Sequence, residues 1–138
     1  MSYLLDTNIV SELRKPRPDP GLVAWFNAVP AGQLYLSVLA VGEIRQGIER
    51  LSRRDPRQAA VFTPWLTALR QRFGDRVLDI DEEVAETWGR LSAVAPLPVV
   101  DGLMAATALV HDLTFVTRNQ RDVRTTGVPV LDPFSATA

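Results

Sequence analysis

The chain opens with the stretch Tyr3-Leu4-Leu5-Asp6-Thr7-Asn8-Ile9-Val10, which decides how the rest is organised. Its apolar start predicts a short buried strand that ends on the carboxylate of Asp6, and the chain then turns through Thr7 and Asn8 into a helix. A carboxylate at the end of a buried strand costs desolvation free energy unless hydrogen bonds or a cation compensate for it. From this stretch alone, Asp6 is either the N-cap of the following helix or part of a polar site.

Length and composition limit the class of protein. The 138 residues are enough for one domain around one hydrophobic core. Because the chain has no cysteine, a metal would have to be held by oxygen atoms or by the single histidine, His111. No signal peptide is recognisable, and no apolar run approaches the roughly 20 residues of a membrane span. We therefore predict one domain over residues 1–138 of a cytoplasmic protein that is not associated with a membrane.

Charge is informative in its distribution. The formal net charge of −1 provides no global field that would attract a polyanion. Positive charge is almost entirely arginine, in clusters around Arg14, Arg50 and Arg118. The planar guanidinium group binds phosphate through two parallel hydrogen bonds, although a charged cluster can equally be a solvated surface.

Apolar periodicity, prolines and capping residues divide the chain into alternating strands and helices. Strands are predicted at 3–5, 34–36, 77–80, 114–117 and 128–131, the last at a sheet edge because it contains Pro129. Helices are predicted at 9–14, 20–29, 38–54, 56–73, 81–94 and 99–113. Strands separated by helices indicate a parallel sheet with helices on both faces. We therefore predict an α/β fold with three layers, α/β/α, around a mainly parallel sheet of four to five strands.

Polar residues occupy equivalent places in this pattern. Asp6 ends the first strand, and Glu43 lies on the helix after the second strand. Asp101 lies in the first turn of an almost wholly apolar helix, and Asn119 follows the fourth strand. Parallel sheets bind ligands beyond the carboxyl ends of their strands, so we expect these residues to converge on one rim. Clustered carboxylates repel one another, and a hard cation such as Mg²⁺ or Mn²⁺ relieves that repulsion, which predicts metal-assisted phosphate chemistry.

Each acid also has a purely structural interpretation. Asp6 could cap a helix, and Asp101 could interact with a helix dipole. Glu43 could pair with Arg45 or Arg50 on its own helix. The joint occurrence of the acids favours a site, and the absence of the glycine-rich signatures G-x-G-x-x-G and G-x-x-x-x-G-K-[ST] argues against dinucleotide and P-loop sites.

Four segments together resemble a PIN domain, and most of all the VapC toxins of bacterial toxin–antitoxin pairs, in the FitB-like branch. These segments are Leu5-Asp6-Thr7-Asn8, Leu36-Ser37-Val38-Leu39-Ala40-Val41-Gly42-Glu43-Ile44, Asp101-Gly102-Leu103-Met104-Ala105-Ala106-Thr107-Ala108 and Thr117-Arg118-Asn119. The Ser11-Glu12 continuation and the proline-rich loop that follows add to the similarity, which covers essentially the whole chain.

The resemblance implies an endoribonuclease that depends on Mg²⁺ or Mn²⁺, with Asp6, Glu43 and Asp101 as metal ligands. The fourth acid of the family corresponds to Asn119, which adds no negative charge, and Asp122 is the nearby acid that could take its place. The implied reaction is hydrolysis of an RNA phosphodiester by a metal-activated water. The residues expected to orient the carboxylates by hydrogen bonds are Thr7, Asn8, Ser37 and Thr117, and those expected to hold flanking phosphates are Arg14, Arg45 and Arg118.

The resemblance also implies partners. The toxin would be a homodimer that acts on RNA, with tRNA among the candidates, and that is inhibited by a DNA-binding antitoxin. It would contact DNA only through that antitoxin, and the complex would repress its own operon. One alternative is a PIN fold of little nuclease activity that acts mainly in transcriptional autoregulation. Another is a hydrolase of small phosphate esters.

Overall fold

The sheet of the computed structural model, which describes residues 1–134, is parallel throughout. Its strands are β1 (Tyr3–Leu5), β2 (Leu34–Ser37), β3 (Val77–Leu78), β4 (Thr114–Val116) and β5 (Val130–Leu131), in the order β3-β2-β1-β4-β5. The predicted α/β class, parallel sheet and edge position of the last strand are therefore confirmed. Residues 135–138, which the single-domain prediction includes, lie outside the described residues.

Several of the helices have an aspartate as N-cap. The helices are α1 (Thr7–Leu13), α2 (Pro20–Ala28), α3 (Val38–Ser52), α4 (Pro56–Phe73), α5 (Glu82–Val94), α6 (Val99–Val110) and α7 (Gln120–Val123). Asp19, Asp55 and Asp81 accept hydrogen bonds from backbone N–H groups in the first turns of α2, α4 and α5. Within residues 1–134, no helix has both the length and the apolar composition needed to cross a membrane.

Several element boundaries differ from the sequence prediction by one to three residues, and three of the differences have a clear structural reason. Helix α1 begins at Thr7, two residues early, because Asp6 is its N-cap. Strand β3 ends at Leu78 instead of residue 80, because its partner β2 ends at Ser37, where α3 begins. Helix α6 ends at Val110, since Asp112 adopts a positive φ of 56° that helical geometry does not allow. The short helix α7 was not predicted.

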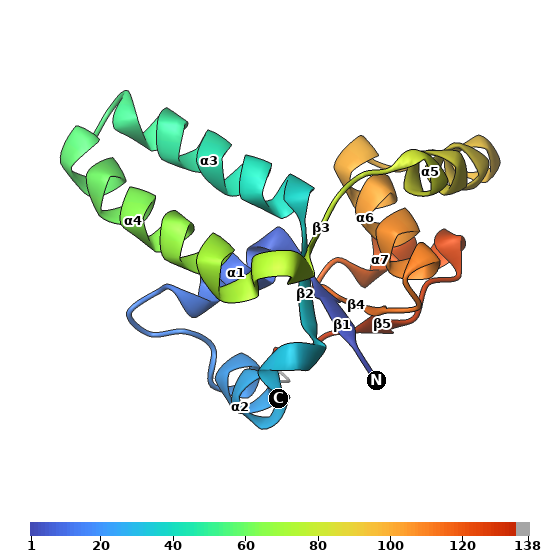
Figure 1. The fold of residues 1–138 in the computed structure, drawn as a ribbon, viewed down its shortest axis with the longest axis horizontal. Coiled ribbons are helices and arrows are strands. Elements are labelled where there is room, and N and C mark those ends of the chain that lie inside the picture. The colour runs from blue at the N-terminus through green and yellow to red at the C-terminus, as the bar shows by residue number, and fades with distance from the viewer. Residues whose placement is uncertain (135–138) are drawn as a thin grey trace.

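Both faces of the sheet are buried, which accounts for the apolar character of its strands. Leu5 packs into a core with residues of α1 to α4, whereas its neighbour Leu4 packs into a second core with residues of α6 and α7. Figure 1 shows α3 and α4 side by side on one side of the sheet, and α5 and α6 on the other. This arrangement confirms the three layers.

The order of the strands reverses beside β1. The chain places β2 and β3 on one side of β1 and returns to place β4 and β5 on the other. In such sheets a crevice opens beyond the carboxyl ends of the two strands that flank the reversal. Here those strands are β1 and β4, which are followed directly by Asp6 and Thr117.

Candidate functional site

Asp6 is held in place through both of its carboxylate oxygens. Oδ1 accepts a hydrogen bond of 2.8 Å from the backbone N–H of Thr7, and Oδ2 accepts one of 2.7 Å from Oγ1 of Thr117. The residue is only 7% exposed. Asp6 therefore caps α1, as one interpretation of the sequence had it, and the same carboxylate also lies in the crevice at the strand reversal. The two interpretations do not exclude each other.

A polar pocket of about 380 Å³ lies in this crevice, and we call it the acidic pocket. It is lined by Asp6, Thr7, Asn8, Ser11, Glu43, Gln46, Gly47, Arg50, Asp101 and Asn119. The four residues that were expected to converge from the strand ends and the neighbouring helices, Asp6, Glu43, Asp101 and Asn119, thus line one pocket. Asp122 does not line it.

Negative charge accumulates in the acidic pocket. Burial raises the pKa of Asp6, the hydrogen bonds from Thr117 and Thr7 partly offset this rise, and the charge of Glu43 adds to it. The pKa of Asp101 is also raised, first by burial and then by the charges of Asp6, Asp122 and Glu43. In residues 1–134 no ion pair neutralises these carboxylates. Arg50 is the single basic residue in the pocket lining, against three acids, so negative charge predominates in the pocket.

Glu43 is positioned from two directions. Helix α3, which carries it, begins at Ser37, whose Oγ accepts a hydrogen bond of 3.0 Å from the N–H of Leu39. The Glu43 Oε1 atom accepts a hydrogen bond of 2.5 Å from Oγ1 of Thr7. Ser37 thus fixes the start of α3. In residues 1–134 its hydroxyl oxygen bonds to a backbone N–H, whereas the sequence prediction had it orient a carboxylate. The alternative pairing of Glu43 with Arg45 or Arg50 is not found there.

Asn119, the neutral residue that lines the pocket beside the three acids, is hydrogen-bonded to Asp122. The backbone N–H of Asn119 donates to Oγ1 of Thr117 over 2.9 Å, and its Nδ2 donates to Oδ2 of Asp122 over 2.7 Å. Asp122 therefore orients Asn119 and acts on Asp101 only through its charge.

The arginines expected to hold phosphate do not line the acidic pocket. Arg14 lies over the rings of Phe62 and Trp65, and Arg118 lies over the ring of Phe134. Arg45 is 4.0 Å from Glu49.

The sequence prediction also missed Ser11, Gln46 and Arg50 as pocket residues. Two of them could have been found by helical spacing, because positions 43, 46, 47 and 50 share one face of α3. Asn8, which was predicted, lines the pocket with an exposed side chain.

The donor atoms of the acidic pocket suit a hard divalent cation. They are carboxylate and amide oxygens, the ligands that Mg²⁺ and Mn²⁺ prefer. Within residues 1–134 no three acidic or histidine side chains form a ready-made metal cage. Mg²⁺ is usually held by one or two carboxylates and retains several waters, so the pocket fits a hydrated cation.

Comparisons with known proteins agree with the fold and with the site. A family model described as PIN domain matches residues 3–127. Toxin FitB of Neisseria gonorrhoeae is 31% identical over 136 residues, which cover 95% of this chain and 97% of that protein. VapC ribonuclease Y4jK of Sinorhizobium fredii is 32% identical over 139 residues, which cover 95% and 96%.

The fold has close structural counterparts as well. In the solved structure of FitAB bound to an IR36 DNA fragment, a chain that is 29% identical superposes with a TM-score of 0.88. The match covers 99% of this chain and 98% of that one. The chain therefore belongs to the PIN domain family, in the group that includes the FitB and VapC toxins.

Proposed function

We propose that this protein is an endoribonuclease toxin of a type II toxin–antitoxin pair, which hydrolyses RNA phosphodiesters with the aid of Mg²⁺ or Mn²⁺. The observation that carries the proposal is the convergence of Asp6, Glu43, Asp101 and Asn119 in one pocket at the strand reversal. The description of the relative Y4jK as a VapC ribonuclease supports the same reaction class.

Asp6, Glu43 and Asp101 would hold the cation, and the amide oxygen of Asn119 would be available as a neutral ligand. A divalent cation in such a site lowers the pKa of a water molecule and offsets the negative charge that develops on the phosphoryl oxygens. The carboxylates supply the negative charge that the cation requires. The raised pKa values of Asp6 and Asp101 are consistent with this role, as is the absence of an ion pair to any of the three carboxylates in residues 1–134.

The contribution of the chain itself is orientation. Thr117 and the N–H of Thr7 fix both oxygens of Asp6, and the hydroxyl of Thr7 fixes Glu43, so the two carboxylates are set before any ligand enters. Hydrogen bonds of this kind typically change metal affinity or activity about 10- to 100-fold when they are removed. Arg50, on the wall of the same pocket, is placed to donate to a phosphate oxygen of the RNA.

The partners follow from the relatives. The FitAB structure contains DNA, and its toxin chain has nearly the same fold as this chain. We therefore propose a DNA-binding antitoxin as the partner, with DNA contacted through it and with the toxin as a homodimer in the cytoplasm. The proposed substrate is RNA, with tRNA as a candidate.

The test compares cleavage of an RNA mixture that includes tRNA, in Mg²⁺, in Mn²⁺ and in EDTA. Asp6→Asn and Asp101→Asn should each lower the rate by about 100-fold or more, because each removes a charge used in the transition state. Asp79→Asn is the matched control, since Asp79 is exposed and lies outside the acidic pocket.

The outcomes separate the alternatives. If the parent protein cleaves no RNA with either metal but still binds its antitoxin, the nuclease proposal fails and the autoregulatory alternative gains support. Turnover of a generic phosphate ester that competing RNA does not reduce would instead identify a hydrolase of small phosphate esters.

A further inference from the structure

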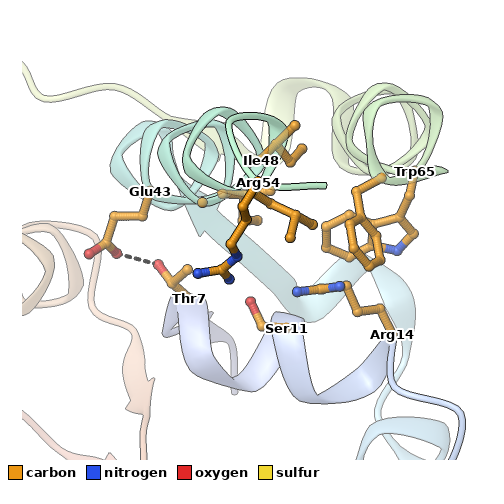
Figure 2. Close-up of a pocket in the computed structure, with 11 residues that line it drawn as sticks. Thr7, Ser11, Arg14, Glu43, Ile48, Arg54 and Trp65 are labelled. Atoms are coloured by element: carbon orange, nitrogen blue, oxygen red, sulfur yellow. Dashed lines mark hydrogen bonds between the residues drawn. The ribbon is translucent and has the colours of Figure 1, made fainter. Parts of the chain in front are cut away.

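A second cavity, of about 210 Å³, adjoins the acidic pocket between α1, α3 and α4, and we call it the arginine pocket (Figure 2). Its lining residues include Arg14, Arg54, Phe62 and Trp65. It shares Thr7, Ser11, Glu43 and Gly47 with the acidic pocket. Because four residues belong to both walls, an extended ligand bound at the acids can continue directly into the arginine pocket.

Two guanidinium groups enter this cavity, whose lining contains a single acid, Glu43. Figure 2 shows the side chains of Arg14 and Arg54 directed into it, with the hydroxyl of Ser11 facing the same space. Glu43 lines the cavity too, but its carboxylate accepts a hydrogen bond from Thr7. In residues 1–134 neither arginine forms an ion pair, and the Ser11 hydroxyl has no hydrogen-bond partner. Two like charges that face one cavity favour an anion between them.

Ring contacts hold the side chain of Arg14 at the cavity, and the turn between α3 and α4 fixes the backbone of Arg54 there. The guanidinium carbon of Arg14 is 4.0 Å from the centre of the Phe62 ring and 5.6 Å from that of Trp65, distances typical of cation–π contacts. Arg54 lies in the turn between α3 and α4, and its N–H donates to the carbonyl of Leu51 over 3.1 Å. The next residue, Asp55, caps α4. The turn is therefore anchored on both sides of Arg54.

We propose that the arginine pocket binds a phosphate of the RNA backbone adjacent to the scissile phosphate. The inference rests on the proposed function, because it takes RNA to be the ligand of the acidic pocket. Arg14 and Arg54 would donate to the non-bridging oxygens, and the Ser11 hydroxyl would add a third donor. A phosphate held here fixes which phosphodiester of the strand reaches the acids. The arginine pocket thus sets the register of the substrate.

The test is the salt dependence of RNA binding, measured in the Asp101→Asn background so that the RNA stays intact. The probe is a fluorescein-labelled single-stranded RNA oligonucleotide. Arg54→Gln should weaken binding about tenfold, as expected for loss of a charged hydrogen bond. It should also reduce the slope of log K against log salt by about 0.7, the value for one phosphate contact on a single strand. Arg53→Gln is the matched control, because this neighbouring arginine lines neither pocket.

Ser11→Ala provides a second variant that keeps the charge. It should weaken binding a few-fold without changing the slope, since it removes a neutral donor. Thermal melts of all variants will verify that they fold.

Each remaining outcome decides against the proposal. An unchanged slope for Arg54→Gln, or equal losses for Arg53→Gln and Arg54→Gln, would mean that only general positive charge attracts RNA. Weaker binding of the antitoxin by Arg54→Gln, with RNA binding unchanged, would assign the arginine pocket to the protein partner. Failure of the parent protein to cleave RNA refutes the proposed function separately, because the binding comparison does not depend on cleavage.

Discussion

The hydroxyl of Thr117 donates a 2.7 Å hydrogen bond to Oδ2 of Asp6 and so joins two strand ends that are 111 residues apart in the sequence. Oγ1 of Thr117 also accepts a hydrogen bond from the backbone N–H of Asn119. One buried side chain therefore connects the deepest acid of the pocket to its neutral corner. Because the bond spans the crevice where the strand order reverses, it stabilises the site and the sheet together.

Replacement of Thr117 by valine should test this connection. Thr117→Val keeps the shape but leaves the buried Oδ2 of Asp6 without its donor, which should lower the free energy of unfolding by about 1–3 kcal/mol. RNA cleavage should fall about 10- to 100-fold, because Asp6 loses its orientation. Thr117→Ser keeps the hydroxyl and should stay close to the parent in urea unfolding and in cleavage. Equal losses in both variants would point to packing instead of the hydrogen bond.

The raised pKa values of Asp6 and Asp101 predict how stability depends on pH. Because the folded protein binds these protons more tightly than the unfolded chain, stability without metal should fall as pH rises from the ordinary value of 3.8 through the raised pKa values. Asp101→Asn removes one of the repelling charges, so in EDTA at pH 7 it should melt a few degrees above the parent.

A bound cation should make the parent protein more stable than Asp101→Asn, the reverse of the order expected in EDTA. Mn²⁺ binds the ionised carboxylates and should stabilise the parent more than Asp101→Asn, and this difference should grow with pH. Thermal melts between pH 4 and pH 8, with and without Mn²⁺, measure both effects. A stabilising effect of Asp101→Asn that is the same at every pH would contradict charge repulsion as its cause.

Asn119, the neutral residue of the pocket lining, offers a further test. Asn119→Asp places another carboxylate on the pocket wall and removes the donor to Asp122, so it should destabilise the metal-free protein. The same change should tighten Mn²⁺ binding, roughly tenfold, because the ligand charge increases. Calorimetric titration measures this affinity. Asp122 lies outside the pocket, so Asp122→Asn should weaken Mn²⁺ binding less than Asp101→Asn does. An equal loss of Mn²⁺ affinity in the two variants would identify Asp122 as a metal ligand.

Gly102, next to Asp101, allows α6 to approach α5 closely. A Cβ atom at this position would lie 3.0 Å from Cδ1 of Trp88 and 3.0 Å from Cδ1 of Leu97. Gly89→Ala, on α5 with no atom within 4 Å, should gain about 0.5–1 kcal/mol of stability from helix propensity. Gly102→Ala should be at least about 1 kcal/mol less stable than Gly89→Ala, because the rigid indole must move. Urea unfolding compares the two, and equal gains would show that the α5–α6 contact is loose.

Much of the fold could be predicted from local sequence signals. Proline, aspartate caps and apolar periodicity act over a few residues, and they located the long helices α3, α4 and α5 and the strands around Leu4 and Phe115. These local signals did not predict a strand end correctly where that end depends on a neighbouring strand remote in sequence. Strand β3 is shorter than predicted because β2, its neighbour in the sheet, ends at Ser37.

The candidate site divides in the same way. By itself, the sequence determined that Asp6 ends a buried strand, that Asp101 lies in the first turn of a buried helix, and that Glu43 lies on the helix after the second strand, since strand and helix periods act locally. Only the tertiary structure decided that Thr117 donates to Asp6, that Thr7 donates to Glu43, and that Arg54 lies in a cavity beside the acids. These contacts join elements remote in sequence, and their geometry follows from how the helices pack on the sheet.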